Sequence, residues 1–184
     1  NAMTDSLDKW DKRFLRIAAE VREWSKDPGT KVGCVLVKNR RILSTGYNGF
    51  PQNISDQHLF TGDREYKLAV TIHAEANAIL NAAKNGASTD GSTAYVTFPP
   101  CSNCASALIQ AGVAAVICPH PDQAPERWMK SFSLGSQLLY EAGVSTLYYE
   151  DSSLWTHDNA PSAGPSGLET NSTGLPENLA KTST

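Results

Sequence analysis

Helical and strand-like segments alternate along the second half of this chain, and the alternation limits the folds open to it. Short runs rich in β-branched and aromatic residues follow helical segments, each of which is closed by a glycine. The predicted strands are 93–98, 113–118 and 145–149, and the predicted helices are 72–84, 101–111 and 131–142. Because strands of one sheet that are joined through a helix run parallel, the pattern favours an α/β layered fold.

The first part of the chain adds a helix and a hairpin. Apolar residues recur every three or four positions within 5–26, which predicts an amphipathic helix that ends at a Pro-Gly break. Two strand-like runs, 31–37 and 41–47, are joined by the polar residues KNR and predict a β-hairpin. The turn-rich stretch 48–58 is predicted to be a long loop.

The length and the net charge of the chain limit the kinds of molecule that the protein is expected to bind. The chain has 184 residues and a formal net charge of −3. A protein that grips a phosphate backbone usually carries a basic excess, so a small-molecule partner is expected and nucleic acid is not. No apolar run reaches the length of a membrane span, and no basic start leads into an apolar signal region. We therefore expect a cytoplasmic protein that does not bind membranes.

By composition, the chain divides into a domain and a tail. Asn1 and Ala2, which precede Met3, read as the remnant of a cleaved expression tag. Residues 3–150 carry the predicted elements and are expected to form one domain, whereas 151–184 are rich in Ser, Thr, Gly and Pro. Such a tail becomes ordered only when it packs on something, and we predict that it lies at a subunit interface.

Three residues have the chemistry and the placement of zinc ligands. The cysteines of a chain without an export signal are expected to be reduced, which favours metal binding over a disulfide for the close pair. Cys101 and Cys104 begin a predicted helix, one turn apart on the same face, where the helix dipole favours thiolates. His73 stands at the start of another predicted helix. If the two helices begin side by side on one face of the sheet, the three side chains meet.

A glutamate stands beside these ligands. Three protein ligands leave a fourth tetrahedral position for water, as in catalytic zinc sites, and zinc lowers the pKa of that water to about 7. Glu75 lies two residues from His73 and can take the proton of the water and pass it to a leaving group. The joint pattern, H-x-E followed by P-C-x-x-C, is the signature of zinc deaminases that act on cytosine or adenine.

Other interpretations of these residues stay open. A C-x-x-C pair can be a redox pair or half of a zinc finger, and a single His or a first-turn Glu is more often structural. A structural zinc ion needs a fourth ligand, for which Cys118 and His120 after a following strand are candidates. Cys34 lies within an apolar strand and is expected in the core.

Four motifs together resemble deoxycytidylate (dCMP) deaminases of the zinc-dependent cytidine deaminase superfamily. They are SKDPGTKVG at 25–33, GYNGFP at 46–51, HAEANAI at 73–79 and PCSNCA at 100–105, and the resemblance runs in order over residues 8–149. The HAE and PCxxC motifs are shared by the whole superfamily, whereas SKDP and GYNG indicate the dCMP branch.

The resemblance implies a three-layer α/β/α sandwich with a five-stranded mixed sheet, and a homo-oligomer that is expected to be a hexamer. It implies hydrolytic conversion of dCMP to dUMP with release of ammonia, by a zinc-bound hydroxide with Glu75 as the proton shuttle. In that family pattern His73, Cys101 and Cys104 bind Zn²⁺. The resemblance also implies activation by dCTP and inhibition by dTTP, with Mg²⁺ on the effector triphosphate.

Substrate and effector residues are expected near the SKDP and GYNG motifs. Asn48 is expected to contact the nucleotide sugar, since its amide offers a donor and an acceptor. Ser25 and Lys26, beside the Pro-Gly turn, are candidates for the substrate phosphate. The resemblance assigns the effector site to the GYNG motif, which comprises Gly46, Tyr47, Asn48 and Gly49.

One loop departs from the family. Family members often carry a base-stacking tyrosine in a short Asp-rich loop after the fourth strand. This chain instead has PHPDQAPERWMKSF at 119–132, which is longer and lacks tyrosine. His120 and Trp128 are the candidates to pack on the base in its place.

Two other functions are consistent with the same residues. One is another zinc deaminase, acting on cytidine or on adenosine in tRNA, although the acidic net charge disfavours tRNA. The other is a non-catalytic zinc-containing nucleotide sensor, which a fourth protein ligand on the metal would favour.

Overall fold

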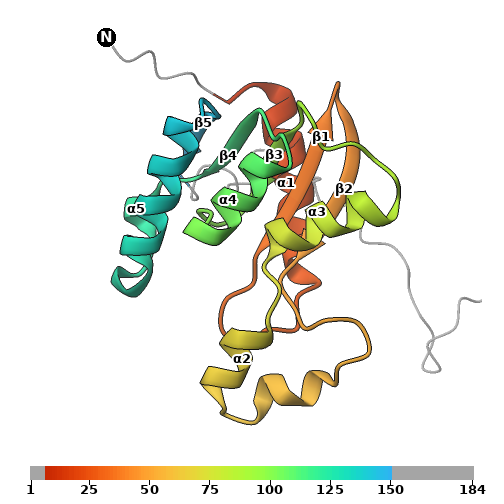
Figure 1. Ribbon diagram of the computed structural model, residues 1–184, viewed down its shortest axis with the longest axis vertical. Coiled ribbons are helices and arrows are strands. Elements are labelled where there is room, and N and C mark those ends of the chain that lie inside the picture. Colours follow the sequence, from red (N-terminus) through yellow and green to blue (C-terminus); the bar gives the residue numbers. More distant parts are fainter. Residues whose placement is uncertain (1–6, 151–184) are drawn as a thin grey trace, which may run out of the picture. The chain divides into compact units, whose positions relative to one another are not determined.

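A five-stranded mixed sheet organises residues 7–150, the part of the chain that this computed structural model describes (Figure 1). The strands are β1 Gly33–Lys38, β2 Arg41–Tyr47, β3 Thr93–Val96, β4 Ala115–Pro119 and β5 Ser145–Tyr149. They lie in the order β2-β1-β3-β4-β5, which confirms the predicted number of strands. The predictions for the tag remnant at 1–2 and for the tail at 151–184 fall outside the described residues.

Both pairing directions occur in this sheet. β1 pairs antiparallel with β2 and with β3, while β3, β4 and β5 run parallel. The hairpin between β1 and β2 turns at Asn39 and Arg40, which both adopt left-handed backbone conformations, with φ of 52° and 59°. Two consecutive residues with positive φ are what a type I′ hairpin turn requires. The predicted hairpin and the predicted parallel strands are therefore confirmed.

Helices cover both faces of the sheet. α1 (Lys9–Glu23) lies on one face, where Phe14 packs on Tyr95 of β3 with ring centroids 5.3 Å apart. The other face carries α3 (Ala74–Lys84), α4 (Ser102–Gln110) and α5 (Glu126–Glu141), which share one apolar core cluster with the strands (Figure 1). This arrangement confirms the predicted three-layer α/β/α sandwich.

The side chains of strand β1 are buried on both faces of the sheet. Cys34 and Leu36 belong to the core cluster that contains α3 and α4, and Val35 and Val37 alternate with them and are also buried. A strand that is buried on both faces reads as a continuous apolar run, which is how it stands in the sequence. The expectation that Cys34 is a core residue is confirmed, since it is 0% exposed.

The structure adds two helical segments between β2 and α3 that the sequence does not predict. They are a short 3-10 helix, η1 (Asp56–Phe60), and α2 (Arg64–Val70). α2 has no buried residue, so it lacks the apolar stripe by which an amphipathic helix is recognised. Its start is fixed by Asp63, whose carboxylate accepts a hydrogen bond from the backbone N–H of Tyr66 at 2.9 Å.

Helix α5 begins earlier than the sequence predicts, at Glu126 rather than at 131. Its first turn follows a proline-rich stretch, and its N-cap residue, Pro125, forms no side-chain capping hydrogen bond that would mark the start in the sequence. The earlier start places Arg127 and Trp128 on a helix rather than in a loop.

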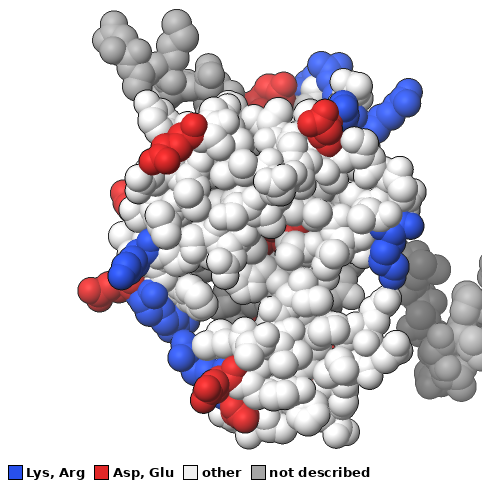
Figure 2. Space-filling model, viewed as in Figure 1, with Lys and Arg blue, Asp and Glu red and all other residues white. Residues whose placement is uncertain are grey.

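Charged side chains lie mainly at the edges of the face that Figure 2 shows. Acidic and basic side chains both occur around the rim of this face, with several basic side chains next to one another at its lower left (Figure 2). Within residues 7–150, no helix has the length and apolar character needed to cross a lipid bilayer.

Strand β2 and helix α3 come into direct backbone contact at Gly46. A Cβ atom at this position would lie 2.3 Å from the carbonyl oxygen of Ala74 and 2.3 Å from the amide nitrogen of Ala78, so only glycine fits. Nearby, the hydroxyl of Ser44 donates a hydrogen bond to the carbonyl oxygen of Ala78 at 2.7 Å. These contacts fix the start of α3 on the sheet, and with it the position of residue 73.

We expect Gly46→Ala to destabilise the protein by about 1–3 kcal/mol, because the added methyl group forces strand and helix apart. Gly49→Ala is the matched control, since its Cβ would meet only the Tyr47 ring, at 3.9 Å. The control should change the free energy of unfolding by about 0.5 kcal/mol or less. Urea unfolding followed by circular dichroism compares the two variants, and equal stabilities would contradict the packing argument.

Candidate active site

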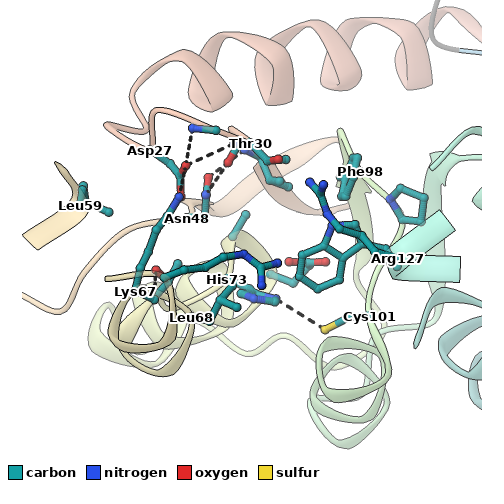
Figure 3. A pocket seen from close by; sticks show the side chains of 18 of the residues that line it. Asp27, Thr30, Asn48, Leu59, Lys67, Leu68, His73, Phe98, Cys101 and Arg127 are labelled. Carbon is teal, nitrogen blue, oxygen red and sulfur yellow. Dashed lines mark hydrogen bonds and ion pairs between the residues drawn. The ribbon is translucent and has the colours of Figure 1, made fainter. Parts of the chain in front are cut away.

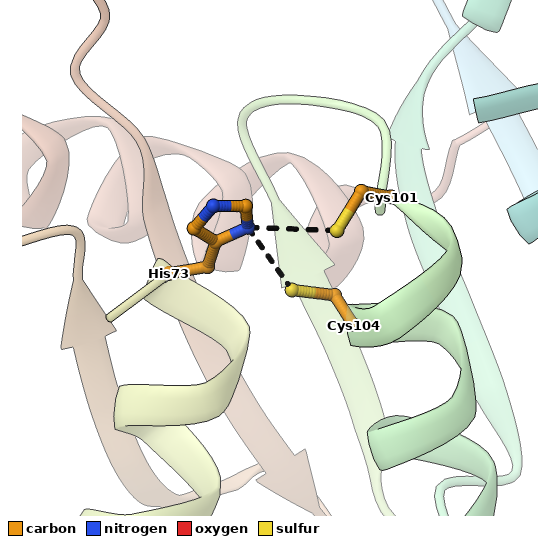
Figure 4. Close-up of side chains that lie close together, drawn as sticks. All are labelled: His73, Cys101 and Cys104. Atoms are coloured by element: carbon orange, nitrogen blue, oxygen red, sulfur yellow. Dashed lines mark hydrogen bonds between the residues drawn. The ribbon is translucent and has the colours of Figure 1, made fainter. Parts of the chain in front are cut away.

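Three potential metal ligands converge where α3 and α4 begin (Figure 4). The Nδ1 atom of His73 lies 3.5 Å from Sγ of Cys101 and 3.4 Å from Sγ of Cys104. Within the described part of the chain, this is the one group of three or more His, Cys, Asp or Glu residues whose ligand atoms gather, all within 4.8 Å of one another.

The spacing of the donor atoms fits a tetrahedral zinc ion. With a Zn–N bond of about 2.1 Å and a Zn–S bond of about 2.3 Å, the nitrogen and sulfur ligands of one tetrahedron lie about 3.6 Å apart. The two N–S distances in the cluster are close to this value. One imidazole and two cysteine sulfurs are also donors that zinc prefers.

The starts of two helices place all three side chains. His73 is the N-cap residue of α3 and Cys101 is the N-cap residue of α4, and neither side chain forms a capping hydrogen bond. Both side chains therefore turn away from their own helix and toward each other (Figure 4). Cys104 lies one turn into α4 and adds its sulfur on the same side.

A thiolate is stabilised within this cluster. Hydrogen bonds with the Cys104 thiol and with His73 hold the pKa of Cys101 well below its ordinary value, despite the burial of the side chain. The hydrogen bond to Cys101 in turn raises the pKa of His73. Negative charge beside an imidazole at two helix N-termini is an environment that suits a divalent cation.

Neither candidate for a fourth protein ligand joins the cluster in the described part of the chain. Burial raises the pKa of the Cys118 thiol, which keeps it neutral. His120 accepts a hydrogen bond from the backbone N–H of Asp122 at 3.2 Å, and its ring packs on that of Tyr148 with centroids 4.9 Å apart. The described residues thus leave one tetrahedral position open, which is the arrangement of a catalytic rather than a structural zinc site.

Glu75 lies in the first turn of α3 and is 3% exposed. Burial raises the pKa of its carboxyl group to about 7, against the opposing effects of a backbone hydrogen bond and of the charge on His73. A carboxyl group that titrates near neutrality can both accept and donate a proton.

A cavity of about 380 Å³ opens over the cluster (Figure 3). His73, Glu75 and Cys101 line it, and its walls come from the segment 27–32, from α2, from the residues before α4 and from the start of α5. Its volume lies within the range of about 300–1,000 Å³ that is usual for small-molecule sites.

Aromatic side chains form one wall of the cavity. Trp128 stacks on Phe132 with ring centroids 6.1 Å apart, and Phe98 meets Phe132 edge-on at 5.3 Å. Of the two residues that could replace the missing tyrosine, Trp128 borders the cavity, whereas His120 is not among its lining residues.

The structure brings one of the three predicted substrate residues to the cavity. Asn48 lines it and is buried, and its side-chain amide bonds the backbone of 30–32 through two hydrogen bonds of 2.8 Å. Ser25 and Lys26 are not among the lining residues. The hydroxyl of Ser25 donates to the carbonyl oxygen of Asn48 at 2.8 Å, and the Nζ of Lys26 lies 2.5 Å from the carboxylate of Asp56. This geometry lends no support to a phosphate contact by Ser25 or Lys26.

Each residue of the GYNG motif has contacts within the chain. Gly46 permits the close approach of α3, and the carbonyl oxygen of Tyr47 accepts a hydrogen bond from the side chain of Asn77 at 2.8 Å. Gly49 forms an isolated β-bridge with Ile72 through backbone hydrogen bonds of 2.9 and 3.1 Å. The motif thus ties β2 to α3, and its effector role stays a prediction.

Sequence analysis does not single out the charged residues of the cavity walls. Arg64 and Lys67 come from α2, and Arg127 comes from the start of α5. Lys67 lies 2.7 Å from Asp27, whose carboxylate is 6% exposed and also accepts backbone hydrogen bonds from the turn that follows it. The SKDP motif contains Asp27 and could have indicated it, whereas an exposed α2 gives no signal for Arg64.

Comparison with known proteins identifies the group to which this arrangement belongs. A family model for the cytidine and deoxycytidylate deaminase zinc-binding region matches residues 8–119, which include Glu75 and the three clustered residues. The chain belongs to this family. The resemblance seen in its motifs is thereby confirmed, and the protein is a zinc-dependent deaminase.

Relatives of this deaminase agree with that placement. An uncharacterized deaminase in the luxG 3′ region of Aliivibrio fischeri is 41% identical over 143 residues, which cover 77% of this chain and 95% of that protein. A probable deoxycytidylate deaminase of Drosophila melanogaster is 40% identical over 119 residues, which cover 59% of this chain and 58% of that protein. The crystal structure of dCMP deaminase from the cyanophage S-TIM5 in complex with dCMP and dUMP matches with a TM-score of 0.63 at 27% identity, over 78% of this chain and 99% of that chain.

We expect the deaminase to bind one zinc ion per chain through this cluster. Cys104→Ala should weaken zinc binding by more than the roughly 10- to 100-fold that loss of an outer partner costs, because a ligand itself is removed. Cys118→Ala removes a buried thiol outside the cluster and should keep the metal. Elemental analysis and chelator competition measure both variants. Loss of zinc from Cys118→Ala would indicate a structural zinc site with Cys118 as its fourth ligand. Retention of zinc by Cys104→Ala would contradict the assignment of Cys104 as a ligand.

Proposed function

We propose that this deaminase converts dCMP and water to dUMP and ammonia. The observation that carries the proposal is a buried Glu75 next to a three-ligand cluster that leaves one tetrahedral position open, at the bottom of a cavity. The likeness to a probable deoxycytidylate deaminase, and to a dCMP deaminase crystallised with dCMP and dUMP, supports the choice of substrate.

In this proposal His73, Cys101 and Cys104 hold the metal. Zinc bound there supplies Lewis-acid activation of water, the nucleophile for C4 of the cytosine. The starts of α3 and α4, rather than a loop, position the three ligand atoms.

Glu75 moves the protons of the reaction. Its carboxylate takes one proton from the attacking water and delivers it to N3 of the ring, and it passes the second to the departing amino group. The oxygen of the water remains at C4, so both of its hydrogens are accounted for, one on N3 of the uracil and one in ammonia. A pKa of about 7 suits a group that must carry out both transfers near neutral pH.

The cavity walls hold the nucleoside. Trp128 offers an aromatic surface on which the base packs, in the place of the tyrosine of related enzymes. Asn48 contacts the sugar, since its amide keeps one N–H and one acceptor lone pair beyond its two backbone hydrogen bonds.

Regulation and assembly are proposed on the GYNG motif and the family resemblance. We expect a cytoplasmic homohexamer, activated by dCTP and inhibited by dTTP. Each effector would bind with Mg²⁺ on its triphosphate, near the residues that comprise the motif, Gly46, Tyr47, Asn48 and Gly49.

A substrate comparison tests the proposed reaction. We expect ammonia release and the ultraviolet change from cytosine to uracil with dCMP, at a higher kcat/KM than with deoxycytidine, CMP or a tRNA stem-loop. The dCMP rate should rise with dCTP and Mg²⁺ and fall with dTTP and Mg²⁺. If neither effector changed the rate on dCMP, the proposed regulation would be contradicted and the proposed reaction would stand. If the zinc-loaded protein did not turn over dCMP, the proposed reaction would be contradicted.

Glu75→Gln tests the proton shuttle, because it keeps the size of the side chain and removes proton transfer. We expect kcat on dCMP to fall by about 10²- to 10⁴-fold while the zinc content stays at the wild-type value. Glu20→Gln, which changes an exposed acid on α1, should retain the wild-type rate. If Glu75→Gln kept a near-wild-type kcat, another group would have to carry the protons.

A further inference from the structure

Two arginines that no motif covers face the cavity from different walls. Arg64 is the first residue of α2, and Arg127 lies in the first turn of α5. We propose that these two guanidinium groups together bind the 5′-phosphate of the substrate and so make the deaminase select nucleotides over nucleosides. This inference rests on the proposed function and deepens it.

The positions of the two arginines suit the outer end of a bound nucleotide. Both residues are exposed, whereas Glu75 at the inner end of the cavity is 3% exposed. Figure 3 shows Arg127 on the side of Phe98 and Cys101, and the α2 residue Lys67 on the opposite side of the cavity. A nucleotide whose base reaches Glu75 would therefore present its phosphate near the mouth, between α2 and α5.

The described acidic side chains that line the cavity do not form ion pairs with these two arginines. Asp27 is already paired with Lys67 at 2.7 Å, and Asp63 uses one carboxylate oxygen to cap α2. Among the described residues, neither Arg64 nor Arg127 forms an ion pair. The outer end of the cavity thus carries two free guanidinium groups against the single carboxylate of Asp63, which complements a phosphate dianion.

Guanidinium groups are suited to this task by their geometry. Each presents planar pairs of N–H donors that match two oxygens of a phosphate, so two arginines from separate walls can engage all three non-bridging oxygens. Lys67 acts differently, because its ion pair with Asp27 holds α2 against the 27–30 turn.

Substrate discrimination tests the inference. Arg64→Ala and Arg127→Ala should each lower kcat/KM for dCMP by about 10- to 100-fold, and should leave kcat/KM for deoxycytidine unchanged. Lys130→Ala is the matched control, since it removes an exposed cation from α5 that does not line this cavity. Equal losses on both substrates, or a loss in Arg127→Ala no larger than in Lys130→Ala, would overturn the proposal.

Binding of the product separates this inference from the proposed reaction. Calorimetry with dUMP and with deoxyuridine should show tighter binding of dUMP to the wild-type protein, and both arginine variants should lose that advantage. If no substrate is deaminated but this pattern holds, the phosphate site stands and the proposed function falls. If dCMP is deaminated but both variants keep the preference for dUMP, the proposed function stands and the phosphate site falls.

Discussion

The rest of this structure depends on the meeting of two helix N-termini. For the Nδ1 of His73 to lie 3.5 and 3.4 Å from two cysteine sulfurs, α3 and α4 must begin side by side on one face of the sheet. Two glycines permit the close packing around them. A Cβ at Gly46 would lie 2.3 Å from the backbone of α3, and a Cβ at Gly135 would lie 2.6 Å from the carbonyl oxygen of Pro100, just before α4. Backbone contact, which larger side chains would prevent, therefore sets the geometry of the ligands.

That geometry brings ionisable side chains together in a buried site. A single bound cation would offset the free-energy cost of burying their negative charge. Burial pushes Glu75 toward its neutral form, with a pKa of about 7, and the cluster stabilises a thiolate at Cys101 through hydrogen bonds. Isolated buried charge is unfavourable, so a divalent cation bound by the cluster would stabilise the fold as well as supply the chemistry.

The sequence predicts the chemical centre better than the walls around it, and the reason is local geometry. His73, Glu75, Cys101 and Cys104 sit at helix starts, where spacing along the chain determines which way side chains face. The loop after α1 has no such regularity: Ser25 bonds the backbone of Asn48, Lys26 pairs with Asp56, and Asp27 reaches the cavity. Three successive residues thus have three separate environments, and no periodic pattern could have shown which of them faces a ligand. The exposed α2 was missed for a related reason, since a helix without a buried stripe leaves no period to detect.

The residues of the chemical centre and some residues of the cavity walls also differ in where they lie relative to the family match. The family match ends at residue 119, before Arg127 and Trp128, and the ligands and Glu75 all lie within it. α2 borders the cavity and has no buried residue, whereas the start of α5 packs Trp128 and Phe132 against Cys101 and Cys104. The stretch 119–132 lacks the tyrosine that the resemblance leads one to expect, and it brings Arg127 and Trp128 to the cavity on the first turn of α5. In this fold the sheet and two helix starts place the three candidate ligands and Glu75, and α2 and the start of α5 form the walls of the cavity above them.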